Sequence, residues 1–139
     1  MKLDKAKFRY IEHELYNYDL TKLEIEELRV DIISGTPQKD DNTTGIQTTR
    51  ISNPTAARGE KLVTSKAIVQ MERVIRAIDR ALARLNDTHR MLFELKYRQA
   101  LSWQGVVVQM AVCDRSYFGY RLDLVKMVAL ELGLISDLE

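Results

Sequence analysis

The sequence is poor in residues that build turns and cross-links. Its 139 residues include two prolines, six glycines and one cysteine. So few turn-forming residues argue against an all-β protein, whose many short strands need frequent turns. The lone thiol, Cys113, excludes an internal disulfide and leaves no thiol cluster for zinc. We therefore expect neither a disulfide framework nor a metal site.

Long apolar runs are missing as well. The longest stretch without a charged residue, 99–113, contains glutamines, a serine and a glycine, whereas a membrane helix needs about 20 mostly apolar residues. The first ten residues, MKLDKAKFRY, are charged at five positions, so no apolar signal core forms there. Hydrophobic residues at 45% and charged residues at 29% are typical of a soluble globular protein, which we expect in the cytoplasm.

Signatures of catalysis are also absent from the sequence. It has no glycine-rich phosphate loop, no serine elbow, and no paired acid and base in a recognisable setting. The acidic pairs Glu26-Glu27 and Asp40-Asp41 fall on a predicted solvated helix face and in a predicted loop. We expect that the protein is not an enzyme and that it binds no cofactor.

The dominant positive signal is helical periodicity. Near the start of the chain, spacings of three, four and three residues separate Phe8, Ile11, Leu15 and Tyr18. The phase of this pattern changes near Asp19, whose carboxylate could cap a second helix. Residues 1–33 are therefore predicted to form an N-terminal helical arm, either as two helices or as one kinked helix.

The stretch 34–61 breaks this periodicity. It holds both prolines, three of the six glycines and six threonines, and its few apolar residues have no regular spacing. Such a composition is typical of a loop or linker, and a structureless loop of this length is uncommon inside a compact domain. We predict a polar linker that separates the arm from a second domain, 62–139.

Residues 62–139 are predicted to be helical throughout, which makes the fold class all-α. A long helix has one apolar face, formed by Ala67, Met71, Val74, Ile78, Leu82 and Leu85. Asn86, Asp87 and Thr88 then stop this helix and cap the next one, 88–98.

The end of the chain is predicted to hold two more helices. Ser102 caps a short helix at about 103–110, and a tight turn at Ala111 and Val112 leads to a last helix at about 114–132. Gly133 is expected to end that helix in a left-handed conformation.

The stretch 101–122, LSWQGVVVQMAVCDRSYFGYRL, fits the helix-turn-helix pattern. Its expected core-facing positions are Val106, Met110, Tyr117 and Tyr120. Ala111 occupies the sharp turn, where glycine is usual because a side chain makes the left-handed conformation less comfortable. The motif would span about 102–132, and the start of its second helix would enter the major groove of DNA.

The block 85–132 resembles region 4 of bacterial sigma factors. More closely, CDRSYFGYR at 113–121, followed by ALELG at 129–133, resembles phage regulators of the ArpU and RinA type. The helical arm and polar linker are also similar to the RinA layout. The resemblance implies a phage-encoded, sequence-specific transcription regulator that activates late genes in the cytoplasm of the bacterial host cell.

The resemblance further implies which residues contact DNA. Arg115 and Ser116 match the arginine and the hydroxyl that open the recognition helix, and Arg121 matches a basic position that meets the backbone. Arginine can read guanine O6 and N7 with two hydrogen bonds or clamp a phosphate. At Phe118 and Gly119 the family usually has larger polar or basic residues. Here the ring could contact a thymine methyl group and the glycine could allow close backbone approach.

The predicted partner is double-stranded DNA, with no membrane partner. A contact with host RNA polymerase and a homodimer are left open. In the sigma-like mechanism, Ser102 and Gln104 hold phosphate. Residues 66–126 carry eleven basic and six acidic side chains. Four of the basic ones form a helical row that would either track phosphate or, as we favour, be a solvated face: Arg73, Arg76, Arg80 and Arg84.

Two other functions remain as alternatives. One is a small DNA-packaging adaptor similar to a terminase small subunit, although such adaptors generally place the DNA-binding unit first. The other is a protein-interaction module, which the net charge of +1 permits.

The sequence also predicts where several aromatic residues, the cysteine and the histidines lie. The aromatic residues Phe8, Tyr10, Tyr16 and Tyr18 are expected to pack between the two N-terminal helices. We expect Trp103 against Tyr97 or the last helix, Cys113 half-buried, and both histidines at the surface, namely His13 and His89.

Overall fold

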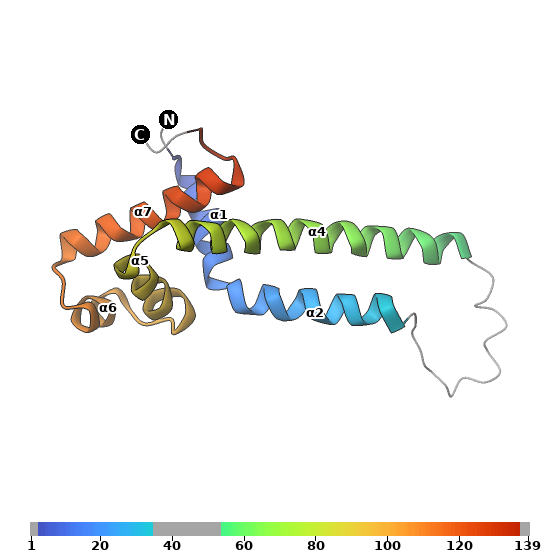
Figure 1. Ribbon diagram of the computed structural model, residues 1–139, viewed down its shortest axis with the longest axis horizontal. Coiled ribbons are helices and arrows are strands. Elements are labelled where there is room, and N and C mark those ends of the chain that lie inside the picture. Colours follow the sequence, from blue (N-terminus) through green and yellow to red (C-terminus); the bar gives the residue numbers. More distant parts are fainter. Residues whose placement is uncertain (1–2, 35–53, 137–139) are drawn as a thin grey trace. The chain divides into compact units, whose positions relative to one another are not determined.

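The computed structural model describes residues 3–34 and 54–136, and the side chains of 3–33 and 62–136. These ranges contain helices and no strand, which confirms the predicted all-α class (Figure 1). Most of the predicted linker, 35–53, lies outside the described residues.

The first two helices are separated by one residue. Helix α1 (Lys5–Tyr16) begins after Asp4, whose carboxylate accepts a hydrogen bond from the Lys7 backbone N–H at 2.8 Å. Asn17 ends it, donating from its backbone N–H to the His13 carbonyl at 3.1 Å.

Helix α2 (Tyr18–Ser34) follows directly, so of the two predicted forms, two helices or one kinked helix, the structure has two helices. The cap expected at Asp19 is wrong, because Asp19 already lies in the first turn of α2. Its carboxylate instead pairs with Arg98 at 3.1 Å.

Helix α4 (Pro54–Arg84) begins earlier than expected, and residues 54–61 of the predicted linker are its first turns. Pro54 occupies the first helical position, where its missing N–H is harmless and its fixed φ suits a helix. Among the next seven residues only Gly59 strongly disfavours a helix. The proline therefore starts the helix, whereas the prediction treated it as part of a loop.

The chain divides into two compact units, one made of residues 1–21 with 73–139 and the other of residues 22–72. This division differs from the predicted one, since α1 belongs with the C-terminal helices and not to a separate arm. The Lys7 ammonium, for example, donates to the Leu134 carbonyl at 3.2 Å.

Three of the four N-terminal aromatic residues, Phe8, Tyr16 and Tyr18, contact side chains of the C-terminal helices and do not pack between α1 and α2 as predicted. Tyr16 stacks edge-on against Tyr97 with ring centroids 4.8 Å apart, and Tyr18 does the same against Phe93 at 5.2 Å. Helical spacing identifies an apolar face but does not identify its partner, which is why the prediction chose the neighbouring helix.

The described part of the unit 22–72 consists of segments of α2 and α4. Among its described side chains, the buried apolar ones are Ile25 of α2 and Ile68 of α4. Arg29 and Glu72 form an ion pair between the two segments.

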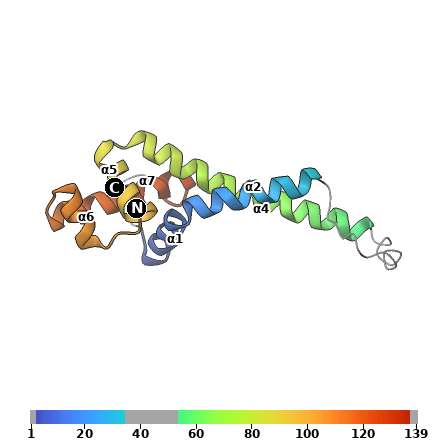
Figure 2. The ribbon, with the colours of Figure 1, turned by 90° about the horizontal axis from the view of Figure 1, so that it is seen from below.

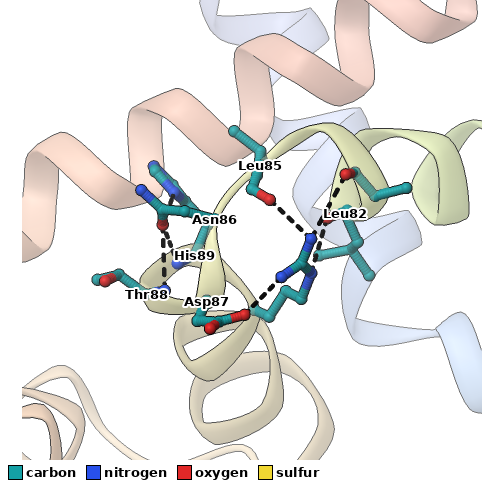
Figure 3. A network of polar contacts seen from close by, with 8 residues as sticks. Leu82, Leu85, Asn86, Asp87, Thr88 and His89 are labelled. Carbon is teal, nitrogen blue, oxygen red and sulfur yellow. Dashed lines mark hydrogen bonds and ion pairs between the residues drawn. The ribbon is translucent and has the colours of Figure 1, made fainter.

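The junction between α4 and α5 (Asp87–Leu92) is closed by a polar network (Figure 3). The Asn86 side-chain oxygen accepts hydrogen bonds from the backbone N–H groups of Thr88 and His89, at 3.1 and 3.2 Å, which confirms the predicted stop and cap. The Arg90 guanidinium donates to the Leu82 carbonyl at 2.9 Å, and so satisfies an acceptor that the end of α4 leaves open.

The helix predicted over 88–98 changes type in its second half. After α5 the chain continues as a π-helix, η2 (Phe93–Arg98), and Gln99 donates from its backbone N–H to the Glu94 carbonyl at 2.9 Å. Within this wider turn Lys96 and Tyr97 are buried. Ala100 then takes a left-handed conformation with φ of 56°.

Helices α6 (Trp103–Met110) and α7 (Asp114–Leu132) have the bounds that the sequence predicts. In Figures 1 and 2, α5, α6 and the start of α7 lie together at one end of their unit. The core of this unit gathers apolar residues from α1, α4, α5 and α7, including Ile11, Leu15, Ile78, Leu92, Leu124, Val125 and Val128. Burial of these side chains fixes α7 along its inner face.

Candidate nucleic-acid interface

The candidate interface is built on α6, the turn 111–113 and the first half of α7. Ser102 takes an extended backbone conformation, and its hydroxyl oxygen accepts a hydrogen bond from the Gly105 backbone N–H at 3.2 Å, so the predicted cap of α6 is confirmed. The hydroxyl proton is still available as a donor, because this bond uses only a lone pair.

The turn after α6 is a left-handed C-cap at Ala111, with φ of 56° and ψ of 46°. Its two closing hydrogen bonds run from the Ala111 N–H to the Val108 carbonyl at 3.2 Å, and from the Val112 N–H to the Val107 carbonyl at 3.3 Å. The predicted tight turn is confirmed. Alanine adopts this conformation despite its side chain, because the two bonds satisfy carbonyls that α6 would otherwise leave open.

The inner sides of the two helices are fixed by burial. Val106 and Tyr117 are fully buried, as expected for core-facing positions. Trp103 packs on α7, with ring centroids 6.3 Å from Tyr117 and 5.7 Å from Phe118. The alternative partner that the sequence offered for the tryptophan, Tyr97, is not its ring contact.

The outward-facing side of α6 and α7 holds most of the predicted contact residues. Gln104, Arg115 and Gly119 are exposed, and Phe118 keeps 46% of its surface accessible. A Cβ atom built on Gly119 would meet nothing within 4 Å. These positions are thus open to a partner.

The N-terminus of α7 carries an exposed thiol. Cys113 occupies the cap position, where burial had been expected, and its sulfur lies 3.4 Å from the Ser116 hydroxyl oxygen. That hydrogen bond, with backbone N–H groups of the first turn, lowers the pKa of the Cys113 thiol. Ser116 is half-buried, and its hydroxyl is shared between this contact and any ligand.

Arg121 lies differently from the other predicted contacts. Its guanidinium forms two hydrogen bonds of 2.8 Å to the Glu12 carboxylate of α1 and stacks over the Phe8 ring at 4.8 Å. The hydrogen bonds that the guanidinium donates to Glu12 raise the pKa of Arg121. This side chain holds α1 against α7, and its predicted contact with the DNA backbone stays a prediction.

Glu12 is the centre of a polar cluster that the sequence did not reveal. It also accepts a hydrogen bond from the Tyr97 hydroxyl at 2.6 Å. Burial raises the pKa of Glu12, but the hydrogen bonds from Arg121 and Tyr97 outweigh burial, so the pKa lies below its ordinary value. Burial and the same carboxylate raise the pKa of Tyr97. Glu12 is 85 and 109 positions from these partners, so no local spacing could have identified the pairs.

Lys96 completes this cluster as a buried cation. Its ammonium donates to the Tyr16 hydroxyl at 3.0 Å and lies over the rings of Tyr16, Tyr97 and Tyr117 at 5.4, 5.2 and 5.9 Å. Burial lowers the pKa of Lys96, but hydrogen bonds with the Tyr16 and Tyr117 hydroxyls outweigh burial and leave it raised. The charge is therefore retained inside the unit and does not reach a surface ligand.

Much of the basic excess between residues 66 and 126 is used inside the molecule. Within the described part of the chain, carboxylates or carbonyls accept hydrogen bonds from four more of these cations, namely Arg73, Arg84, Arg90 and Arg98. The arginine row on α4 thus holds α7 at two points: Arg73 binds the Leu132 carbonyl and Arg84 pairs with Glu131 at 2.6 Å. This supports local pairing over a phosphate track.

His89 is buried, contrary to the expected surface position. Its Nε2 lies 3.2 Å from the Asp123 carboxylate of α7, and its ring stacks edge-on against Tyr120 at 5.3 Å. The histidine therefore links α5 to α7. Within the described ranges no group of three or more histidine, cysteine or acidic side chains could hold a metal ion.

The described residues thus form an all-α protein in which the short helix α6, capped by Ser102, precedes α7 with its exposed outer face. None of the described helices is long and apolar enough to cross a membrane. Residues 4–129 match the family model described as "Protein of unknown function (DUF722)", and the chain belongs to this family. The comparisons with curated proteins and with solved structures gave no match.

Proposed function

We propose that the protein is a sequence-specific DNA-binding transcription regulator that places the first half of α7 in the major groove. One observation carries this proposal: α6 and α7 are joined by a tight left-handed turn and contact each other through the rings of Trp103 and Tyr117, while the opposite side of α7 is exposed. This is the arrangement in which helix-turn-helix proteins present their second helix to base edges.

The exposed groups suit complementary tasks on a duplex. Arg115 is exposed, and no ion pair to it occurs in the described ranges, so its guanidinium is available for guanine or phosphate. The hydroxyl proton of Ser102 and the amide of Gln104 can donate to phosphate oxygens, which would fix the register of α7. Ser116 and Gly119 lie along the same first half of α7.

The wider biological role rests on the resemblance to ArpU and RinA regulators. We propose that the chain is phage-encoded, acts in the host cytoplasm and activates late genes. A sigma-region-4-like module would do so by contacting the host RNA polymerase while α7 is bound to DNA.

The test is duplex binding with an arginine variant. Duplexes tiling the genome segment that encodes the chain would be titrated with the full-length protein, next to scrambled duplexes of equal length. We expect one duplex to bind preferentially, and Arg115→Ala to weaken that binding by roughly 1–3 kcal/mol. Arg80→Ala, which removes an exposed arginine of α4, is the matched control and should bind like the wild type. Equal binding of wild type and Arg115→Ala would show that the recognition helix is assigned wrongly.

A second candidate, a protein-docking module, is favoured by the apolar character of the same surface. Val108 of α6 is 77% exposed and Trp103 is 37% exposed. Absence of any salt-dependent DNA binding would favour this candidate. The DNA-packaging adaptor stays the other alternative, and light scattering would reveal the ring of many subunits that packaging requires.

A further inference from the structure

The outward side of α7 forms one continuous stripe. Arg115, Phe118, Gly119 and Leu122 are spaced i, i+3, i+4 and i+7, so they lie on the same face of the helix. All four are exposed, with 46% of Phe118 and 39% of Leu122 accessible. The stripe therefore presents one cation, two apolar side chains and a bare backbone position between them.

Phe118 is exposed and yet held in place. Its ring packs edge-on against Tyr117 with centroids 4.9 Å apart, and tilted against Trp103 at 5.7 Å. Tyr117 is itself buried, so one side of the phenylalanine rests on the core while the other faces outward. A ring fixed in this way loses little rotational freedom when a ligand covers it.

The chemistry of the stripe selects among groups in the major groove. Guanine offers O6 and N7 to an arginine, whereas the 5-methyl group of thymine is the apolar group on base edges there. None of the four stripe residues carries a side-chain amide that would read adenine or a carboxylate that would read cytosine, and the nearest exposed carboxylate on α7 is Asp114, one turn before Phe118. Gly119 leaves room beside Phe118 for a methyl group to approach, since nothing occupies the space of its missing Cβ.

We infer that Phe118 reads thymine by its 5-methyl group, with Arg115 reading guanine on the N-terminal side of it. This inference rests on the proposed function, because it assigns base preference to a helix that must first enter the groove. Leu122 extends the apolar end of the stripe by one turn.

The experiment changes the DNA and leaves the protein intact. Short random duplexes would be enriched by rounds of binding to the full-length protein, and the selected duplex would be remade with deoxyuridine at one thymine at a time. Deoxyuridine pairs like thymine but lacks the methyl group. We expect about a fourfold loss of affinity at one or two thymines, the value of one buried methyl group, and no change at the others.

Two variants assign the effect to a side chain. Phe118→Ala should bind thymine and deoxyuridine duplexes equally, whereas Met91→Ala, which truncates an apolar residue of α5 that is 50% exposed, should keep the fourfold preference. Retention of the preference in Phe118→Ala would assign the methyl contact to another residue.

The outcomes separate this inference from the proposed function. Enrichment of a defined duplex that contains no thymine, or one that is insensitive to every deoxyuridine substitution, overturns the inference and leaves the DNA-binding function standing. No enrichment and no salt-dependent binding would overturn both.

Discussion

At the scale of single residues, the two C-caps of α6 and α7 show how much a side chain matters. Gly133 ends α7 with φ of 78° and Ala111 ends α6 with φ of 56°, and each cap is closed by the same two kinds of hydrogen bond. Glycine reaches this region freely, whereas alanine is strained there by its Cβ atom. The left-handed turn at Ala111 therefore lowers the stability of the fold, whereas the same turn at Gly133 carries no such strain.

Ala111→Gly should relieve that strain. We expect the free energy of unfolding to rise by up to about 1 kcal/mol, the strain relief minus the greater freedom that glycine gives the unfolded chain. Ala83→Gly, at an exposed position in the last turn of α4, is the control and should lower it by up to about 1 kcal/mol. Urea unfolding measures both changes. A destabilised Ala111→Gly protein would contradict the left-handed conformation at this turn.

Glu12 gives a second prediction at this scale. Its pKa is lower in the folded protein than its ordinary value of 4.5, so its stabilising contribution is complete above pH 4.5 and is lost as pH falls through the lower folded value. Glu12→Gln should therefore lower the free energy of unfolding at pH 7 by about 1–3 kcal/mol, because Arg121 loses its charged partner.

Chemical denaturation across the acidic range would check this. The difference between wild type and Glu12→Gln should shrink as pH falls below 4.5, whereas Glu24→Gln, an exposed carboxylate-to-amide change on α2, should differ little from wild type throughout. A difference that stays constant down to low pH would mean that the carboxylate's charge is not what stabilises α1 against α7.

At the scale of elements, helix bounds that depend on residues close together in the chain could be predicted from the sequence. The bounds of α6 and α7 follow from a serine cap, a small turn residue and a terminal glycine, all of which act within a few residues. The π-helical turn over 93–98 has no comparable signal. Its buried residues Lys96 and Tyr97 form hydrogen bonds with side chains of α1, which lies some eighty residues earlier in the chain.

The same distinction explains the candidate site. Exposure of Arg115, Phe118 and Gly119 followed from placing Tyr117 on the inner face of α7, because helix geometry then orients its neighbours. The pairing of Arg121 with Glu12 could not be predicted, because the sequence has 20 acidic residues and does not show which of them the fold brings next to Arg121. The DNA contact of Arg121 is predicted from its match to a basic position of the ArpU and RinA regulators, and that match carries no information on the pairing with Glu12.

At the scale of the whole molecule, the distribution of charge is more informative than its sum. The chain has a net charge of +1, and residues 66–126 hold a basic excess, for whose arginine row we favour a solvated face over a phosphate track. Much of that excess takes part in intramolecular contacts, with Arg84, Arg90, Arg98 and Arg121 in ion pairs and Lys96 in the core. A duplex would consequently meet few free cations, and shape and base contacts would have to supply more of the affinity.

The salt dependence of DNA binding makes this argument measurable. Each neutralised phosphate contributes a slope of about −0.9 to the plot of log affinity against log salt, so two or three contacts predict a slope of about −2 to −3 for one protein chain. Arg115→Ala should make the slope shallower by about one unit if that guanidinium contacts phosphate, and should leave it unchanged if it reads only guanine. Arg84→Ala should leave the slope unchanged, because Arg84 is paired with Glu131. A wild-type slope of about −6 or steeper would show that the internal ion pairs open when DNA binds, and that the charges holding α1 and α4 against α7 also serve the duplex.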